Sequence, residues 1–243
     1  MKALVFASRT TKEIIRDPIS LFFSIVFPII LLLLLTAINR NIPTDLFNIE
    51  HLTPGIAVFS LSFLSLFSAQ ILAKDRSSSF LIRLFTTPMT ARDFIIGYTL
   101  PLLPMAFMQG LACFSVALLL GMKISISLLV ALLLLIPTSL IFIGIGLFCG
   151  TVFSEKAATA ICGALLTNLT AWLSGAWFDL NLVGGSFQTI AYNLPFVHAV
   201  DMGKAATAGN YQAIFPHIWW VLGYGIAILV IAVILFKKKM NMD

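Results

Sequence analysis

The sequence predicts an all-α integral membrane protein with six membrane-spanning helices, and three observations indicate that fold class. Among 243 residues, only 15 are Lys or Arg and 10 are Asp or Glu. Hydrophobic residues make up 60% of the chain, and the mean hydropathy is +1.03. The apolar residues are gathered in long runs, as bilayer crossings require. Because an ordinary soluble domain is about 25% charged, this composition excludes a soluble enzyme, a disordered chain and a nucleic-acid-binding protein.

Residues 1–17 are expected to form an interfacial amphipathic helix, which Pro18 ends. At about 100° per residue, the apolar side is predicted to comprise Leu4, Ala7, Thr11, Ile14 and Ile15. The opposite side carries the charged residues Arg9, Lys12, Glu13 and Arg16. A basic amphipathic helix of this kind lies at the lipid surface. The alternative is a positively charged flank that only sets topology.

Six apolar stretches approach the length of about 20 residues that a bilayer crossing needs. They cover residues 18–38, 53–73, 94–120, 124–148, 157–178 and 218–236. The first is not expected to be a signal peptide, because its apolar core is longer than an h-region and no small-residue cleavage site follows it. We therefore expect it to stay in the protein as a spanning helix.

Basic residues are divided unevenly between the two sides of these six spans. Twelve of the fifteen fall on the side of the N-terminus, including those of the tail at 237–243. Arg40, Lys123 and Lys204 fall on the other side. The net charge of +5 is therefore read as an orientation signal, and the positive-inside rule places both termini in the cytoplasm.

The loop at 74–93 is the longest segment predicted on the cytoplasmic side. Its apolar residues Phe80, Leu81, Leu84 and Phe85 share one face of a short helix, and Arg76 and Arg83 lie at the edge of that face. Thr86, Thr87 and Pro88 are expected to end this helix. Large apolar side chains on a cytoplasmic helix favour docking of a partner protein. Contact with lipid headgroups is the alternative.

The segment at 179–217 is long for a connection between two adjacent spans. It contains two short apolar stretches, Phe187–Leu194 and Phe196–Ala206, which Pro195 separates. Neither is long enough to cross a bilayer. We expect short re-entrant or interfacial helices on the outer side.

Ionisable side chains are absent from the middle of every predicted span. Proton- and sodium-driven transporters usually need such groups at depth. His51, His198 and His217 are too scattered for a metal site or a catalytic base, and no metal is predicted. The sequence also lacks a Gly-rich phosphate-binding loop and the common hydrolase motifs. The chain is therefore not expected to be an enzyme, and energy for uphill transport must come from another chain.

Uncharged polar residues do occur in the spans, and they allow two interpretations. Small residues recur at helical spacing in the fifth span at Thr159, Gly163, Thr167, Thr170 and Ser174, in the second at Ser62, Ser65 and Ser68, and in the fourth at Gly146 and Gly150. They can serve close helix packing or line a translocation path. The bulkier amides Gln70, Gln109 and Asn168 are candidates for that path or for hydrogen bonds between helices.

Three local patterns resemble the ABC-2 type permeases, the membrane subunits of type-2 ABC exporters, of the multidrug-exporter kind. The first is the run from Leu84 to Asp93 with Pro88 in place, and the second is the small-to-aromatic end of the fifth span at Leu173–Phe178. The third is the outer motif at Leu194–Asp201. The order of a surface helix, two spans, a coupling helix and four further spans covers essentially the whole chain.

The resemblance implies that a separate nucleotide-binding ATPase, present in two copies, holds the ATP and Mg²⁺, whereas this chain holds no cofactor. It implies a second permease copy, identical or related, and a location in the cytoplasmic membrane of a prokaryote. The coupling helix would transmit ATPase closure, and the outer region with Asp179, Pro195 and Asp201 would act as the outer gate. The expected function is outward transport of a small amphipathic molecule such as a drug, an antibiotic or a lipid-like compound. A stand-alone secondary transporter or channel is the alternative, and a membrane-embedded enzyme lacks candidate groups.

Overall fold

The computed structural model describes residues 2–41, 48–78, 80, 81, 84, 86 and 88–240, and all regular elements in these residues are helices. The first half comprises α1 (Lys2–Ile15), α2 (Pro18–Asn41), α3 (Ile49–Ser60), α4 (Ser62–Ser77), α6 (Ala91–Leu119) and α7 (Ile126–Val152). The second half comprises α8 (Glu155–Ala160), η2 (Ile161–Leu166), α9 (Thr167–Leu173), η3 (Leu180–Leu182), α10 (Gly185–Tyr192), α11 (Pro195–Thr207), η4 (Tyr211–Ala213) and α12 (Ile214–Met240). An all-α membrane fold is therefore confirmed.

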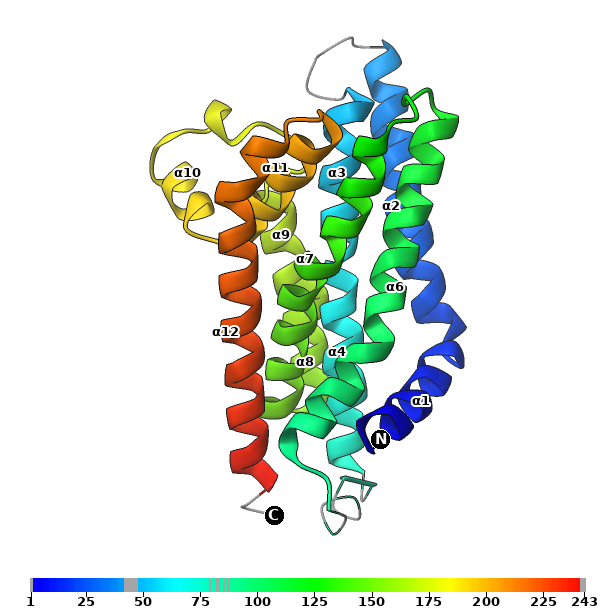
Figure 1. Ribbon diagram of the computed structural model, residues 1–243, viewed down its shortest axis with the longest axis vertical. Helices are drawn as coiled ribbons and strands as arrows, with labels where there is room; N and C mark the ends of the chain where they lie inside the picture. The colour runs from blue at the N-terminus through cyan, green and yellow to red at the C-terminus, as the bar shows by residue number, and fades with distance from the viewer. Residues whose placement is uncertain are drawn as a thin grey trace.

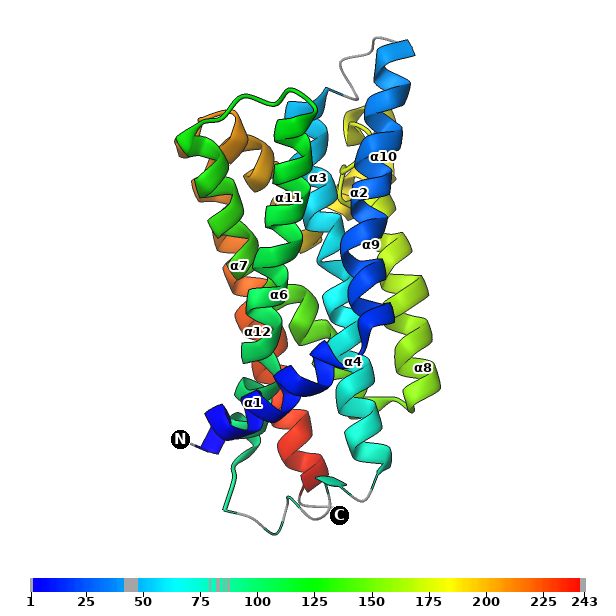
Figure 2. The ribbon, with the colours of Figure 1, turned by 90° about the vertical axis from the view of Figure 1, so that its right-hand side faces the viewer.

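The long helices form an upright bundle with both termini at one end (Figure 1). We call this the terminal end, and we call the opposite end, which carries α10 and α11, the far end. Helix α1 lies across the bundle at the terminal end, at a steep angle to α2 (Figure 2). This orientation is the one expected of a surface helix.

Four helical segments in the described residues are long and apolar enough to cross a membrane: Ile49–Ser77, Ala91–Leu119, Ile126–Val152 and Tyr211–Met240. A shorter apolar segment, Ser24–Asn39, lies inside α2. The segment Ile49–Ser77 is the most buried of the four, so α3 and α4 form the centre of the bundle. The six predicted stretches all coincide with helices, and four of them meet this length and composition criterion.

Several predicted boundaries differ from the structure. The stretch predicted at 53–73 is two helices, which meet at Leu61 and together extend from Ile49 to Ser77. The stretch predicted at 157–178 ends at Leu173, because Gly175 takes a positive φ of 68° and the chain turns there. The close approach of this turn to α3 explains its place, since a Cβ on Gly55 would lie 2.7 Å from the Ala176 carbonyl oxygen. The last helix begins earlier than predicted and continues to Met240.

Glycine allows α4 and α7 to pack closely. A Cβ on Gly146 would lie 1.9 Å from Ser68 Oγ and 2.2 Å from the Ser65 carbonyl oxygen. A Cβ on Gly150 would lie 2.8 Å from the Ala69 carbonyl oxygen. Small residues are the usual means by which membrane helices approach each other, so this pair of helices is held in one register.

Candidate functional site

An ion pair between α1 and α4 is the centre of the candidate site at the terminal end. The two guanidinium nitrogens of Arg9 donate to the two carboxylate oxygens of Asp75, at 2.5 and 2.8 Å. Tyr98 on α6 donates its hydroxyl to Asp75 Oδ2 at 2.8 Å. Asp75 is 3% exposed, so these bonds satisfy a carboxylate that water hardly reaches. Burial acts to lower the pKa of Arg9, but the hydrogen bond and charge of Asp75 outweigh it and raise that pKa.

Aromatic contacts hold α1 against α6 beside this ion pair. The ring of Phe6 meets those of Tyr98 and Phe94 edge to face, with centroids 4.9 and 5.4 Å apart. Gly97 makes room for it, because a Cβ there would lie 2.5 Å from Phe6 Cδ1. Edge-to-face pairs of this kind add about 0.5–1.5 kcal/mol beyond area burial. Helix α1 is therefore fixed to the bundle and does not rest on lipid alone.

The face that α1 packs on protein overlaps only in part with the lipid-facing side that the sequence predicts. Phe6, Ala7 and Thr10 are buried, whereas Leu4 and Ile15 are 61% and 65% exposed. The helical projection found one apolar side, but α1 has two: one packs on protein and one remains open at the surface. Arg9 lies at the protein side. Lys12 and Arg16, the other basic residues predicted for the interfacial helix, are exposed.

The segment that follows α4 is joined to the same network. The Arg9 guanidinium lies 4.2 Å from the centroid of the Phe80 ring, a cation–π contact. Lys2 donates to the Pro88 carbonyl oxygen at 2.7 Å. Leu81 is buried and Leu84 is partly buried against the core. The predicted docking residues Arg83 and Phe85 lie outside the described residues.

Arg76 has a different place from the one predicted. It belongs to α4, which continues to Ser77, and its guanidinium donates to the carbonyl oxygens of Thr151 and Phe153. These carbonyls are at the end of α7, where backbone oxygens lack partners within the helix and the helix dipole favours a cation. Arg76 therefore caps α7 within the chain, which argues against a free surface role in docking.

A cleft of about 1120 Å³ opens beside α1, between α2 and α4. Its lining combines the charged residues Arg9, Lys12, Glu13, Arg16, Asp17, Lys74 and Glu155 with apolar ones such as Leu21, Phe67 and Met105. Gln70, a predicted path residue, also lines it. Lys74 pairs with Glu13 at 3.5 Å. The cleft thus combines charged residues of α1, α4 and α8 with apolar residues of α2, α4 and α6.

The other amide and serine candidates in the central helices make contacts within the bundle. Gln109 is buried and donates to the Ser24 carbonyl oxygen at 3.3 Å. The sequence left two interpretations of Gln109, and this contact is the hydrogen bond between helices. The Ser68 hydroxyl donates to the backbone carbonyl oxygens of Ser65 at 3.1 Å and of Ile143 at 3.2 Å. Both serines are buried against α7, and these contacts favour helix packing over a path.

The polar residues of the fifth stretch differ in burial and in hydrogen-bond partners. Thr170 and Ser174 are buried, and their hydroxyls have no partner among the described residues. Thr167 donates to the Cys162 carbonyl oxygen at 3.2 Å, five residues back, in the π-helical segment η2. Asn168 is exposed beside Leu165, Leu169 and Trp172. Its amide nitrogen donates to Ala164 at 2.8 Å.

The far end contains a histidine pair that joins α11 to α12. His198 Nδ1 and His217 Nδ1 are 3.0 Å apart, and His198 Nε2 lies 3.0 Å from the Tyr192 carbonyl oxygen. A carbonyl only accepts, so neutral His198 carries its proton on Nε2 and accepts from His217 at Nδ1. Burial lowers the pKa of His198, and the charge of His217 adds to this effect, whereas Asp201 acts against it. The His198 ring stacks on the Trp220 ring, and the two ring centroids are 4.6 Å apart.

The predicted outer-gate residues fall on two elements of the far end. Asp179 is exposed and accepts from the Asn181 backbone at 2.9 Å, which caps η3. Pro195 is the first residue of α11 and is buried. Asp201 lies further along α11, and burial raises its pKa. Lys204 donates to the Gly175 carbonyl oxygen at 2.9 Å, which ties α11 to the turn after α9.

Sequence reasoning missed Asp75 and Tyr98, the two residues that organise the terminal end. An acid in the last turn of an apolar helix, next to Lys74 and Arg76, was the available signal. Within the described part of the chain, no group of three or more His, Cys, Asp or Glu side chains is arranged to hold a metal ion.

Comparison with known protein families identifies the family of this chain. A family model described as ABC-2 type transporter matches residues 2–206, which includes α1, the central helices and most of α11. No curated protein matches the chain. The match covers well over half of the sequence and agrees with the all-helical fold and its long apolar helices. The chain therefore belongs to the ABC-2 type transporter family of membrane permeases.

Proposed function

We propose that this chain is the membrane-spanning permease subunit of an ATP-binding cassette exporter, powered by a separate ATPase. Family membership supports the permease role. The observation that carries the rest is the network around Asp75, because it ties α1, α4, α6 and Phe80 into one unit at the terminal end. ATP and Mg²⁺ would reside in two copies of the partner subunit, with no cofactor in this chain.

The proposed topology has six crossings with both termini in the cytoplasm. At 1.5 Å per residue, the 24 residues of α2 extend about 36 Å and the continuous run Glu155–Leu173 about 28 Å. Both lengths suit a hydrocarbon core of about 30 Å. The position of both termini at one end agrees with an even number of crossings (Figure 1). The distribution of basic residues supports the orientation, in the cytoplasmic membrane of a prokaryote.

The ATPase is proposed to dock at the segment between α4 and α6. Phe80, Arg83, Leu84 and Phe85 are the proposed contact residues. We assign Arg76 to the capping of α7 because its donors are already bonded to that helix. Movement of the docked segment would reach α1 through the contact of Phe80 with Arg9.

A second copy of the permease, or a related chain, is proposed to pack on the exposed face of α8, η2 and α9. Asn168 supports this arrangement, because an exposed amide among apolar side chains is unfavourable against lipid and needs a polar environment. The π-helical turn at Ile161–Leu166 lies in the same face, and such turns are frequent at functional sites. The translocation path would then run along Asn168 and Thr167 between the two copies.

The proposed substrate is a small amphipathic molecule. The cleft beside α1 supports this class, because its lining offers both charged and apolar residues to a molecule with a polar head and an apolar body. Gln70 and Lys12 would meet the substrate on the cytoplasmic side. On the outer side, the region of Asp179, Pro195 and Asp201 would open for release.

The test is purification of the full chain from its native membranes together with any bound ATPase, followed by transport in inside-out vesicles. We expect a stoichiometric ATPase and ATP-dependent uptake of a fluorescent amphiphile. Arg83→Glu should weaken ATPase retention at least about tenfold, as removal of a well-placed interface anchor does. Lys123→Glu, with the same charge change in a loop at the far end, is the matched control. Transport that persists without ATP or any ATPase would contradict the proposal and indicate a secondary transporter or channel.

A further inference from the structure

A second open site lies away from the cleft, between α6 and α12. It is a groove of about 710 Å³ with an almost entirely apolar lining. The residues that form its walls are Ile96, Leu100, Leu103, Ile226, Val230 and Ile234. Arg92 lies at one end. Neither the ion-pair network nor the proposed path uses these residues.

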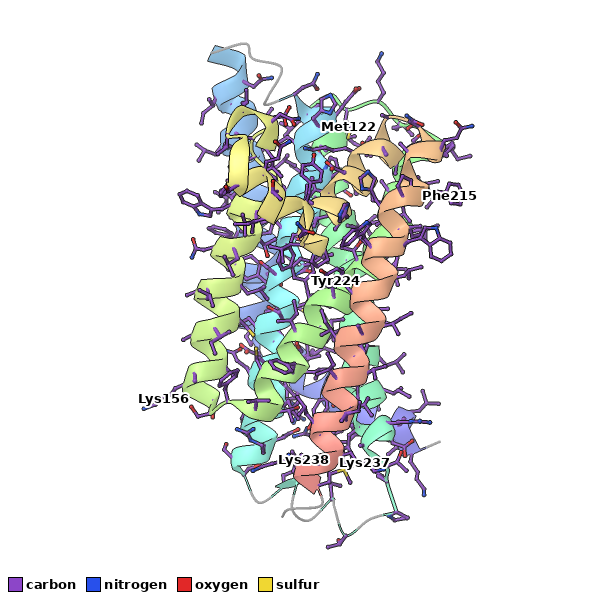
Figure 3. All side chains as sticks on the ribbon, turned by 90° about the vertical axis from the view of Figure 1, so that its left-hand side faces the viewer. Met122, Lys156, Phe215, Tyr224, Lys237 and Lys238 are labelled. Atoms are coloured by element: carbon purple, nitrogen blue, oxygen red, sulfur yellow. The ribbon has the colours of Figure 1, made fainter. Side chains whose placement is uncertain are left out.

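Basic residues gather at the Arg92 end of the groove. On α12, Val230 and Ile234 are four residues apart on the groove face, and Lys237 and Lys238 continue that face one turn further. The rings of Phe94 and Phe236 are 5.4 Å apart, which brings the ends of the two helices together there. Figure 3 shows Lys237 and Lys238 at the terminal end of α12.

Within the described part of the chain, these cations have no acidic partner. None of the ion pairs found in the described residues involves Arg92, Lys237 or Lys238. Asp93, the acid next to Arg92, accepts instead from the Thr90 hydroxyl at 2.8 Å and from its backbone N–H at 2.9 Å. The positive charge at this end of the groove is thus open to an external anion.

The dimensions of the groove match one leaflet of a bilayer. From Arg92 to Leu103, and equally from Lys237 back to Ile226, the walls extend about 16 Å at 1.5 Å per residue. One leaflet contributes about 15 Å of a hydrocarbon core that is 30 Å thick.

We propose that this groove is a binding site for an anionic phospholipid of the inner leaflet, with its acyl chain between α6 and α12 and its phosphate at Arg92, Lys237 and Lys238. The leaflet assignment rests on the orientation in the proposed function; the binding itself does not. A second copy of the chain is the less favourable occupant. A two-fold axis along the membrane normal would place both copies of these three cations at one depth, where they repel.

The test is native mass spectrometry of the full chain in mixed micelles with equal amounts of phosphatidylglycerol and phosphatidylcholine. Wild-type protein should retain one phosphatidylglycerol in preference to phosphatidylcholine. The triple variant Arg92→Gln, Lys237→Gln, Lys238→Gln should lose that preference by at least about tenfold, since each surface cation contributes about fivefold. The control double variant Lys123→Gln, Lys156→Gln removes exposed positive charge outside both the groove and the cleft, and it should retain the preference.

A second variant tests the apolar part of the site with the charges intact. Val230→Trp fills the groove and should therefore remove the retained lipid, whichever headgroup it carries. Ile231→Trp, one residue away and outside the groove lining, should leave lipid retention unchanged. Equal retention of both lipids by wild type, or an unchanged preference in the groove triple variant, would overturn the proposal. Cross-linking of two chains through Val230→Cys in membranes would also overturn it, because the occupant would then be a second copy. None of these measurements depends on the ATPase or on transport.

Discussion

Replacing Arg9 by leucine should destabilise the protein more than replacing Asp75 by leucine, although both changes remove the same ion pair. The difference follows from burial and from the partners that remain. The side chain of Asp75 is 4% exposed, whereas that of Arg9 is 36% exposed. Without Arg9, the carboxylate keeps the hydrogen bond from Tyr98, its one other side-chain donor among the described residues. Without Asp75, the guanidinium keeps Glu13 at 2.9 Å.

The magnitudes can be worked from these partners. A buried charge left alone costs about 3–5 kcal/mol, and the remaining hydrogen bond from Tyr98 offsets part of that cost. We therefore expect Arg9→Leu to cost about 3–4 kcal/mol. Asp75→Leu leaves a half-solvated cation that is still paired, so we expect about 1–2 kcal/mol. The double variant should cost less than Arg9→Leu alone, because no buried carboxylate is then left uncompensated.

The assay is reversible unfolding of the detergent-solubilised chain with SDS, followed by far-ultraviolet circular dichroism. Lys12→Leu, an exposed basic residue in the same helix, controls for the loss of a positive charge in α1. Equal destabilisation by Arg9→Leu and Asp75→Leu would refute the reasoning. A double variant whose cost equals the sum of the two single costs would refute it as well.

Three further predictions test other parts of the molecule. Gly146→Val should destabilise the fold by about 3 kcal/mol or more in the same unfolding assay, because its side chain must displace Ser68, whereas Gly223→Ala, with open space at its Cβ, should be neutral or slightly stabilising. Burial lowers the pKa of His198 below its ordinary 6.5, so the folded state binds fewer protons than the unfolded state under acid conditions. Tm should therefore fall as pH drops from 7 to 5.5. The fall should be smaller in the His198→Gln variant. Asn168→Leu should abolish ATP-dependent export by the assembled complex while leaving the unfolding midpoint of the single chain unchanged. Asn168→Gln, which keeps the amide, should restore export. Equal export by both variants would contradict the proposed path.

The sequence was sufficient to predict where helices form, because a run of about 20 apolar residues has few other stable conformations in a membrane. It could not predict where those helices break. The junction at Leu61 and the turn at Gly175 lie inside runs that are apolar throughout. Their positions depend on contacts between distant segments, such as the approach of Gly55 to Ala176, which periodicity does not record.

The contacts of individual side chains were predicted less well, and α1 shows why. A helical projection separates apolar from charged residues, but it does not distinguish a face that meets protein from one that meets lipid. Leu4 and Phe6 are both apolar, yet only Phe6 is buried. Arg9 was assigned to the surface for its charge, whereas the deciding fact is its acid partner 66 residues away on another helix. Arg76 was assigned to docking for the same reason.

Two contacts of α4 bear on how a docked ATPase would move the bundle. The α4–α7 contact combines close packing of serine and glycine with hydrogen bonds from Ser68 and Arg76 to backbone carbonyl oxygens of α7 and its end. The contact of α1 with α4 and α6 consists of a two-pronged ion pair and a buried tyrosine bond, which fix distance and angle together. A displacement of the segment at Phe80 would therefore be passed to α1, α4 and α6 as one body. We infer that rearrangement occurs where directional bonds are scarce, along the exposed face of α8, η2 and α9, and that the network at Asp75 transmits motion without itself deforming.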